Sequence, residues 1–126
     1  MNNVLIDTSA WIDYFEGGKQ ATKIDSLLDV QLICINKIIM CELYPFLHVN
    51  KQYELLDLLT AVPEVPLTID WDKIIQYQTN ILKNNIKRVG IPDLIIMENV
   101  IQNNLILLTL DKSLLQLKSL FNFKTL

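Results

Sequence analysis

The chain has 126 residues, a formal net charge of −3 and 51% hydrophobic residues. This length is enough for a buried core, so we predict one globular domain over residues 1–126 and exclude an intrinsically disordered chain. The sequence has no apolar run of the about 18 residues that would cross a bilayer. No basic leader precedes an apolar stretch at its start, so we expect neither a membrane protein nor a signal peptide.

The two cysteines, Cys34 and Cys41, both lie inside apolar segments. Buried free thiols in a reducing compartment explain them better than a disulfide or a pair of metal ligands. We therefore expect a cytoplasmic protein.

In chain order, short apolar runs alternate with segments of helical periodicity. We expect a strand at 3–7, helices at 9–15 and 20–29, a strand at 31–35, helices at 37–48 and 51–61, a strand at 65–69, helices at 70–85 and 92–103, a strand at 105–110, a short helix after Asp111 and an edge strand at 121–125. Pro66 puts the third strand near an edge, because proline cannot donate to a ladder. This order predicts an α/β domain with a mostly parallel sheet and helices on both faces.

Two aspartates follow predicted strands. Asp7 ends the first apolar run, and Asp111 comes directly after residues 105–110. Each aspartate is also a good helix N-cap, so capping alone would explain either of them. In parallel α/β sheets, however, ligands bind at the carboxyl ends of the strands, where both residues are predicted to lie.

Glu42 is the only acid in a segment, residues 37–48, that is apolar nearly all round. We therefore predict a largely buried helix with a carboxylate in its middle, where neither capping nor the helix dipole explains an acid. A buried carboxylate without a partner costs several kcal/mol unless it takes up a proton or meets a cation. The other interpretation is a glutamate that reaches solvent through a gap in the packing.

Asp93 follows Pro92 in the first turn of its predicted helix, a position that the helix dipole favours for acids. Together with Asp7, Glu42 and Asp111 it completes a set of four carboxylates. Two such charges about 4 Å apart repel by ~4 kcal/mol at an effective dielectric constant of about 20. A hard divalent cation, Mg²⁺ or Mn²⁺, would relieve this repulsion. A metal-bound water could then hydrolyse phosphodiesters without a covalent nucleophile, and the only histidine, His48, has no evident partner.

The negative net charge does not indicate a nucleic-acid-binding protein, but it does not exclude RNA either. Lys83, Lys87 and Arg88, the only arginine, cluster just before a predicted loop. Two interpretations stay open: a solvated helix end, or a group that touches phosphates.

The run Val-Leu-Ile-Asp-Thr-Ser-Ala-Trp-Ile at residues 4–12, Glu42, Gly-Ile-Pro-Asp-Leu at 90–94 and Leu-Leu-Thr-Leu-Asp at 107–111 together resemble a PIN domain. Among PIN domains, the small VapC-type toxins of prokaryotic toxin–antitoxin pairs are the most similar. The resemblance covers essentially the whole chain. It implies a three-layer α/β/α domain with a mostly parallel five-stranded sheet and a metal-dependent endoribonuclease activity.

The resemblance also implies roles for individual residues. Asp7, Glu42, Asp93 and Asp111 would form the acidic quartet that holds Mg²⁺ or Mn²⁺. Ser9 and Thr109 match the hydroxyls that orient these acids, and Thr8 is a weaker candidate. The implied partners are an RNA substrate, an antitoxin that blocks the site with a basic side chain, and a second copy of the chain in a homodimer.

Two features depart from the family pattern. Many relatives carry a further acid at the position of Ser113, and the helix after Asp93 usually has small residues where this chain has residues 95–98, Ile-Ile-Met-Glu. Glu98 lies about 140° around the helix from Asp93, so we expect it to face elsewhere. These departures bear on the number of bound ions and leave the four acids in place.

Three other functions compete with this one. A non-catalytic PIN-like module would bind RNA or a protein, for which Trp11, Tyr14 and Phe15 would serve as a groove or simply as core. A phospho-accepting receiver domain needs a second acid where Thr8 stands. A haloacid-type phosphatase needs an aspartate where Ser9 stands. The identity of the RNA target does not follow from the sequence.

Overall fold

The computed structural model describes residues 3–126. Four strands form one parallel sheet in the order β2-β1-β3-β4. The strands are β1 (Val4–Ile6), β2 (Ile33–Cys34), β3 (Ile106–Leu108) and β4 (Lys124–Thr125). The predicted α/β fold with a parallel sheet is therefore confirmed.

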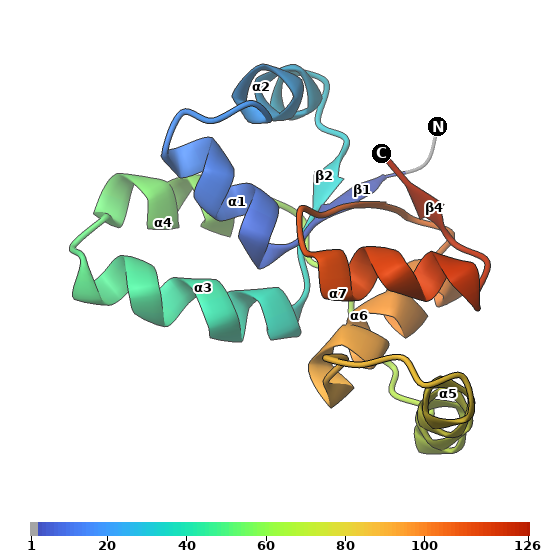
Figure 1. The fold of residues 1–126 in the computed structure, drawn as a ribbon. Helices are drawn as coiled ribbons and strands as arrows, with labels where there is room; N and C mark the ends of the chain where they lie inside the picture. Colours follow the sequence, from blue (N-terminus) through green and yellow to red (C-terminus); the bar gives the residue numbers. More distant parts are fainter. Residues whose placement is uncertain (1–2) are drawn as a thin grey trace.

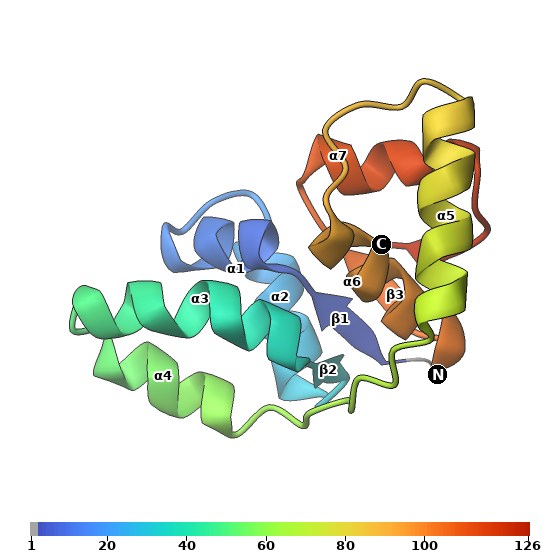
Figure 2. The same cartoon turned by 90° about the horizontal axis from the view of Figure 1, so that it is seen from below.

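Seven α-helices and one 3₁₀-helix connect and cover these strands in the part of the chain described. They are α1 (Thr8–Phe15), α2 (Ala21–Asp29), α3 (Lys37–Val49), α4 (Tyr53–Thr60), α5 (Trp71–Lys83), α6 (Ile91–Gln102), α7 (Lys112–Leu115) and η1 (Gln116–Ser119). Figure 1 shows the whole fold. In Figure 2 the helices form two groups, α1 to α4 and α5 to α7, with the strands between them.

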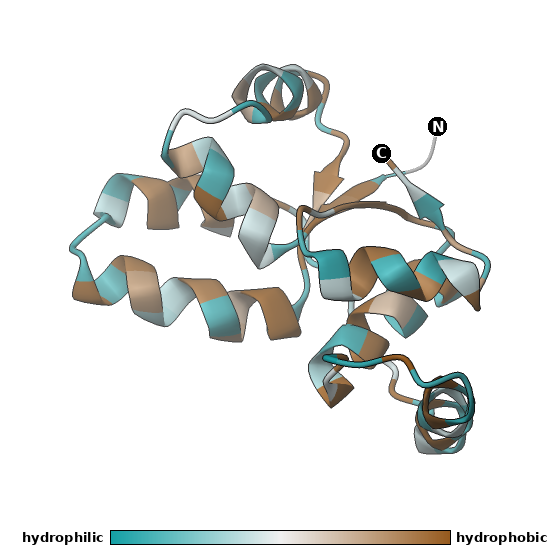
Figure 3. Ribbon diagram, in the orientation of Figure 1, coloured by the Kyte–Doolittle hydropathy of each residue, from teal (hydrophilic) through white to brown (hydrophobic). Residues whose placement is uncertain are grey.

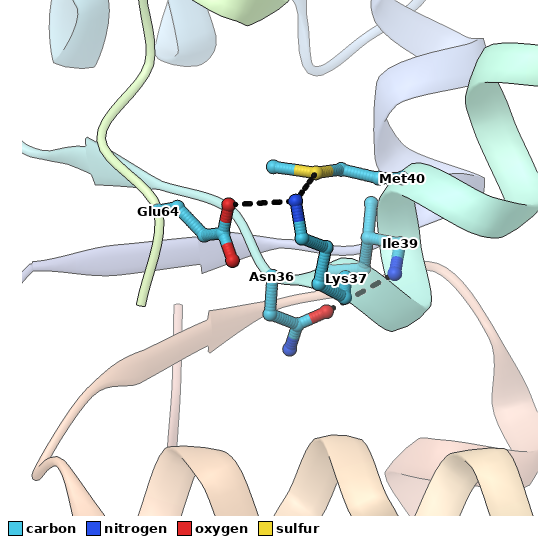
Figure 4. A network of polar contacts seen from close by, with 5 residues as sticks. All are labelled: Asn36, Lys37, Ile39, Met40 and Glu64. Atoms are coloured by element: carbon cyan, nitrogen blue, oxygen red, sulfur yellow. Dashed lines mark hydrogen bonds and ion pairs between the residues drawn. The ribbon is translucent and has the colours of Figure 1, made fainter. Parts of the chain in front are cut away.

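The sequence predicted five strands, and the prediction of the one at 65–69 was wrong. Of this part of the chain, only Glu64 pairs with the sheet, in an isolated parallel bridge to Ile35. Two main-chain hydrogen bonds form the bridge: Ile35 N donates to Pro63 O at 3.0 Å, and Val65 N donates to Ile35 O at 2.8 Å. The ladder stops there because the chain turns into α3 directly afterwards, where the Asn36 side chain accepts a hydrogen bond from Ile39 N as its N-cap. An ion pair of 3.1 Å between Lys37 and Glu64 also holds the two segments together (Figure 4).

The core lies on both sides of the central strands. All three residues of β1 are at most 3% exposed, and β2 is buried as well. In Figure 3 these two strands are hydrophobic along their length, whereas the edge strand β4 is hydrophilic. On one side α6 is buried at every position from 94 to 100, and on the other Trp11 of α1 is fully buried. Burial of the strands from both faces is what a parallel sheet requires.

Within residues 3–126, five non-glycine residues have a positive φ. Four of them, Gln31, Lys51, Asn85 and Asn104, lie two positions after the end of a helix, where a left-handed residue closes the last turn. Arg88, with φ of 65°, is the exception, because it lies inside the loop between α5 and α6. No helix in residues 3–126 is long and apolar enough to cross a membrane.

Candidate functional site

The sheet register explains how the N-terminal aspartate meets the C-terminal part of the chain. Ile6 pairs with Leu108, so the next residues on the two strands, Asp7 and Thr109, are neighbours at the carboxyl edge. The bond from Asp7 N to Leu108 O, at 3.1 Å, continues the ladder to this point. Figure 1 shows the N-terminal ends of α1, α3 and α7 gathered beside this edge, at the centre of the molecule.

Asp7 is 4% exposed, and its carboxylate is held from several sides. Ser9 Oγ donates to Oδ1 and Thr109 Oγ1 donates to Oδ2, each at 2.6 Å. Ala10 N donates to Oδ1 at 3.3 Å, so Asp7 also caps α1. Burial raises the pKa of the Asp7 carboxyl, the hydrogen bonds oppose this increase, and the charge of Asp111 adds to it.

The two hydroxyls connect both strand ends to the start of α7. Ser9 Oγ accepts from Leu110 N, and Thr109 Oγ1 accepts from Asp111 N, each at 3.0 Å. Asp111 in turn caps α7 by accepting from Ser113 N at 2.8 Å. Both interpretations of Asp7 and Asp111 therefore hold at once: each aspartate caps a helix, and each lies at the carboxyl edge of the sheet.

Asp93 is half-buried in the first turn of α6. Its Oδ2 accepts from Gly90 N at 3.1 Å, which fixes the carboxylate against the start of its own helix. Burial raises the pKa of Asp93, Gly90 opposes the increase, and the charges of Asp111 and then Asp7 add to it. These mutual effects mean that the three aspartates lie near one another.

Glu42 is exposed, so the prediction of a buried carboxylate was wrong. The buried stripe of α3 consists of Ile39, Leu43 and Leu47, four residues apart, and Glu42 lies beside it. The helix looked buried because it also carries Phe46 and Val49, which are 49% and 81% exposed. Apolar composition overstated the burial of this helix.

The Glu42 carboxyl nevertheless belongs to the acidic cluster. Its partial burial raises the pKa of Glu42, and the charges of Asp7, Asp93 and Asp111 raise it further. The Thr8 hydroxyl, which is buried and makes no hydrogen bond, lies close enough to oppose the increase. The charges of the three aspartates thus reach Glu42, although it lies on a different helix.

The chemistry of these donors fits Mg²⁺ or Mn²⁺. All are carboxylate or hydroxyl oxygens, which hard cations prefer. No three His, Cys, Asp or Glu side chains within residues 3–126 stand close enough to hold one ion between them. Mg²⁺ needs only one or two direct carboxylates because it keeps several waters. The single ion pair of the described chain joins Lys37 to Glu64, so no basic side chain neutralises the four acids.

One hydrogen bond joins α3 and α6, which each carry an acid of the site. The sequence does not predict that its two residues meet. The fully buried Asn36 donates through Nδ2 to Asn99 Oδ1 at 3.1 Å, and Asn99 Nδ2 donates to Pro66 O at 3.1 Å. This bond ties the start of α3 to the middle of α6. The signal in the sequence was an asparagine inside the apolar run 94–101. Glu98 faces elsewhere, as expected: it is buried and accepts from Tyr77 on α5 at 2.9 Å.

The aromatic N-terminal helix divides between core and surface. Trp11 is core, while Phe15 stacks on it at a centroid distance of 5.8 Å and reaches a groove of about 220 Å³ between α1, α3 and α4. Ile12, Phe46 and Leu55 also line this groove. The groove is separate from the acidic edge, because none of the four acids lines it.

The comparisons with known proteins agree with this architecture. A family model described as the PIN domain matches residues 4–120. A chain in the crystal structure of VapBC2 from Rickettsia felis bound to a DNA fragment from their promoter has a similar fold, with a TM-score of 0.76. The two chains are 16% identical, and the match covers 98% of this chain and 96% of that one. No curated protein matches the sequence.

Proposed function

Because this chain belongs to the PIN domain family, we propose that it is a divalent-metal-dependent endoribonuclease and the toxin of a toxin–antitoxin pair. The observation that carries the proposal is the gathering of four acids at the carboxyl edge of the sheet: the strand register and the Thr109 hydroxyl bring Asp7 and Asp111 together, and the charges of both act on Asp93 and Glu42. Most carboxylates on a protein surface do not gather in this way, because like charges repel. A site for a divalent cation explains why these do.

In this proposal one or two of Asp7, Asp93, Asp111 and Glu42 bind Mg²⁺ directly and the others hold its waters, with Mn²⁺ as the other candidate. The ion would activate a water molecule and stabilise the attacking and leaving oxygens of the phosphodiester. The protein contributes orientation. Ser9 and Thr109 each donate to one oxygen of Asp7, and Gly90 N holds Oδ2 of Asp93, so neither carboxylate needs to reorganise during the reaction.

Glu42 is held less firmly than the three aspartates. Its side chain is exposed and makes no hydrogen bond that would fix it, while partial burial, and then the charges of Asp7, Asp93 and Asp111, raise the pKa of its carboxyl. A bound cation would favour the ionised form of this carboxyl, so in the proposal Glu42 acts as a carboxylate that can turn toward the ion or its waters.

The partners of the proposal follow from two surfaces. The apolar groove between α1, α3 and α4, with Phe46 49% exposed at its side, is suited to an apolar segment of an antitoxin. The similar solved structure is, by its description, a VapBC2 assembly bound to promoter DNA. An RNA substrate would bind at the acidic edge. We further propose that residues 1–126 act as one domain, in the cytoplasm, and as a homodimer.

The test is RNA cleavage by the purified protein. We expect total RNA to be cut with Mg²⁺ and left intact with EDTA, and Asp7→Asn and Glu42→Gln to lose activity while the protein stays folded. Glu54→Gln is the matched control, because Glu54 is an exposed acid at the start of α4 and none of the three shifted acids feels its charge. Cleavage that persists in EDTA, or a fully active Glu42→Gln, would contradict the proposal.

The groove also supports a second function, a non-catalytic module that binds RNA or a protein. Its volume of about 220 Å³ and apolar lining suit a partner without any chemistry at the acidic edge. Binding of RNA without cleavage in Mg²⁺, Mn²⁺ and Ca²⁺ would favour this function.

A further inference from the structure

Basic residues are found in the segments that lead to two of the acids. Lys83, Lys87 and Arg88 lie at the end of α5 and in the loop that leads into α6, and Lys112 is the first residue of α7. All four are exposed. The single ion pair in residues 3–126 is between Lys37 and Glu64, so these four cations have no carboxylate partner. Their charge is therefore free to act on a ligand.

The loop that carries Arg88 is attached to the helix that carries Lys112. Gln116 Nε2 donates to Lys87 O at 2.7 Å. Gln116 follows Lys112 by one helical turn, so the two side chains lie on the same face. The other end of the loop is Gly90, whose N–H holds Asp93. The loop with Lys87 and Arg88 is therefore fixed at one end to η1, which continues α7, and at the other end to the start of α6, which carries Asp93.

The backbone at Arg88 does not call for an arginine. Its φ of 65° is in the left-handed region, where glycine or asparagine is tolerated far better than a residue with a long side chain. The four other left-handed residues apart from glycine close helix ends, and Arg88 has no such role. The contribution of this position is then its guanidinium, a planar group that binds phosphate through two parallel hydrogen bonds.

We propose that Arg88, with Lys87 and Lys112 beside it, binds backbone phosphates of RNA and holds the strand against the acidic edge. This inference rests on the proposed function and names the residues that bring the substrate in. The need for such residues is electrostatic, because a chain of net charge −3 with four clustered carboxylates repels a polyanion. Contacts to phosphates position the strand and do not read its sequence.

The test is a comparison of two matched variants. Arg88→Asn and Lys51→Asn each remove one positive charge at an exposed left-handed residue, and asparagine suits both backbones. Lys51 comes two residues after the C-terminal end of α3, and Figure 1 shows this end of α3 pointing away from α7 and from the centre of the molecule. Arg88→Lys keeps the charge and loses the planar group. All are made in an Asp93→Asn background, so that the RNA stays intact, and binding of a labelled single-stranded RNA is followed by fluorescence anisotropy at several KCl concentrations.

We expect Arg88→Asn to bind about three- to tenfold more weakly and to lower the slope of log affinity against log salt by about 0.7, the value for one phosphate contact to a single strand. Arg88→Lys should keep the slope and lose part of the affinity. Lys51→Asn should match the parent protein in both. Equal affinities for Arg88→Asn and the parent, or an equal loss in Lys51→Asn, would overturn the inference.

Cleavage measured in parallel with Asp93 intact separates this inference from the proposed function. If the protein cuts RNA and Arg88→Asn raises KM with little change in kcat, both stand. If it cuts RNA but Arg88→Asn binds and cuts as the parent does, only the inference fails. If it binds RNA through Arg88 without cutting, only the nuclease proposal fails. A protein that binds no RNA overturns both.

Discussion

The helices α3 and α6 both supply an acid to the same edge and are both rich in apolar residues, yet their environments differ. Positions 94–100 of α6 are buried without a break, whereas α3 buries only the stripe Ile39, Leu43 and Leu47. Asp93 is consequently fixed by a hydrogen bond on a buried helix, whereas Glu42 has no hydrogen bond to fix it and lies on a helix with one exposed side. Apolar composition alone does not tell a central helix from a peripheral one.

The largest effect should come from the held acid. Asp93→Asn removes a charge from the site but keeps an oxygen that can accept from Gly90 N. We expect RNA cleavage to fall about 100-fold or more, as for the loss of a preorganised electrostatic group. Without metal the variant should be as stable as the parent or more so, because burial and the charges of Asp111 and Asp7 act against the Asp93 carboxylate. A marked loss of thermal stability would show that Asp93 serves mainly as a cap.

The second effect concerns the link between the two helices. Asn99→Ala leaves the buried Asn36 amide without its acceptor, and an unsatisfied buried group costs about 1–3 kcal/mol. Urea unfolding should detect this loss. Asn103→Ala is the control, since Asn103 is exposed and only back-bonds to Asn99 O within α6. If the two variants unfold at the same urea concentration, the link does not stabilise the pair of helices.

A smaller effect is expected in the dependence of stability on pH. In the folded state the pKa values of Asp7, Glu42 and Asp93 are raised above the ordinary values. At a pH between the ordinary and the raised pKa, the folded state therefore binds more protons than the unfolded one. The free energy of unfolding contributed by these groups therefore rises as pH falls through the raised values, and levels off below the ordinary ones, at about 4.

Thermal unfolding without metal at several pH values would measure this trend. The dependence of stability on pH should be weaker in Asp93→Asn and in Glu42→Gln than in the parent. Mg²⁺ should reverse it, because a bound cation favours the ionised acids. The pKa directions would be contradicted if the metal-free parent protein lost stability from pH 7 to 5 and the variants without one of these acids lost less.

The smallest effect should be that of Glu42→Leu on stability. Exposed substitutions away from buried features usually change the free energy of unfolding by less than about 0.5 kcal/mol, and Glu42 lies beside the buried stripe of α3. The variant should lose cleavage activity, and relief of the repulsion from the other acids should give at most a small gain in stability. A stabilisation of 1 kcal/mol or more, about the value for a newly buried apolar side chain, would mean that the position is core after all.

Local pattern predicted most of the elements. The helix after Asp70 and the cap of α7 by Asp111 came out as expected, because capping and periodicity act over a few neighbouring residues. The segment 65–69 did not become a strand, because a strand needs a partner and the chain after Ile35 had already entered α3. The candidate site depended on the same distinction: which residues are acidic could be read off, but how enclosed each one is could not.

The amino-acid order alone determined the parallel α/β plan and the presence of Asp7 and Asp111 at the ends of apolar runs, since strands, caps and turns are short-range features. Only the tertiary structure decided that Glu42 is exposed, that Asn36 and Asn99 join α3 to α6, and that Gln116 attaches the Arg88 loop to η1. These outcomes depend on contacts between segments from about 30 to more than 60 residues apart in the chain, and no local preference specifies which distant partners meet.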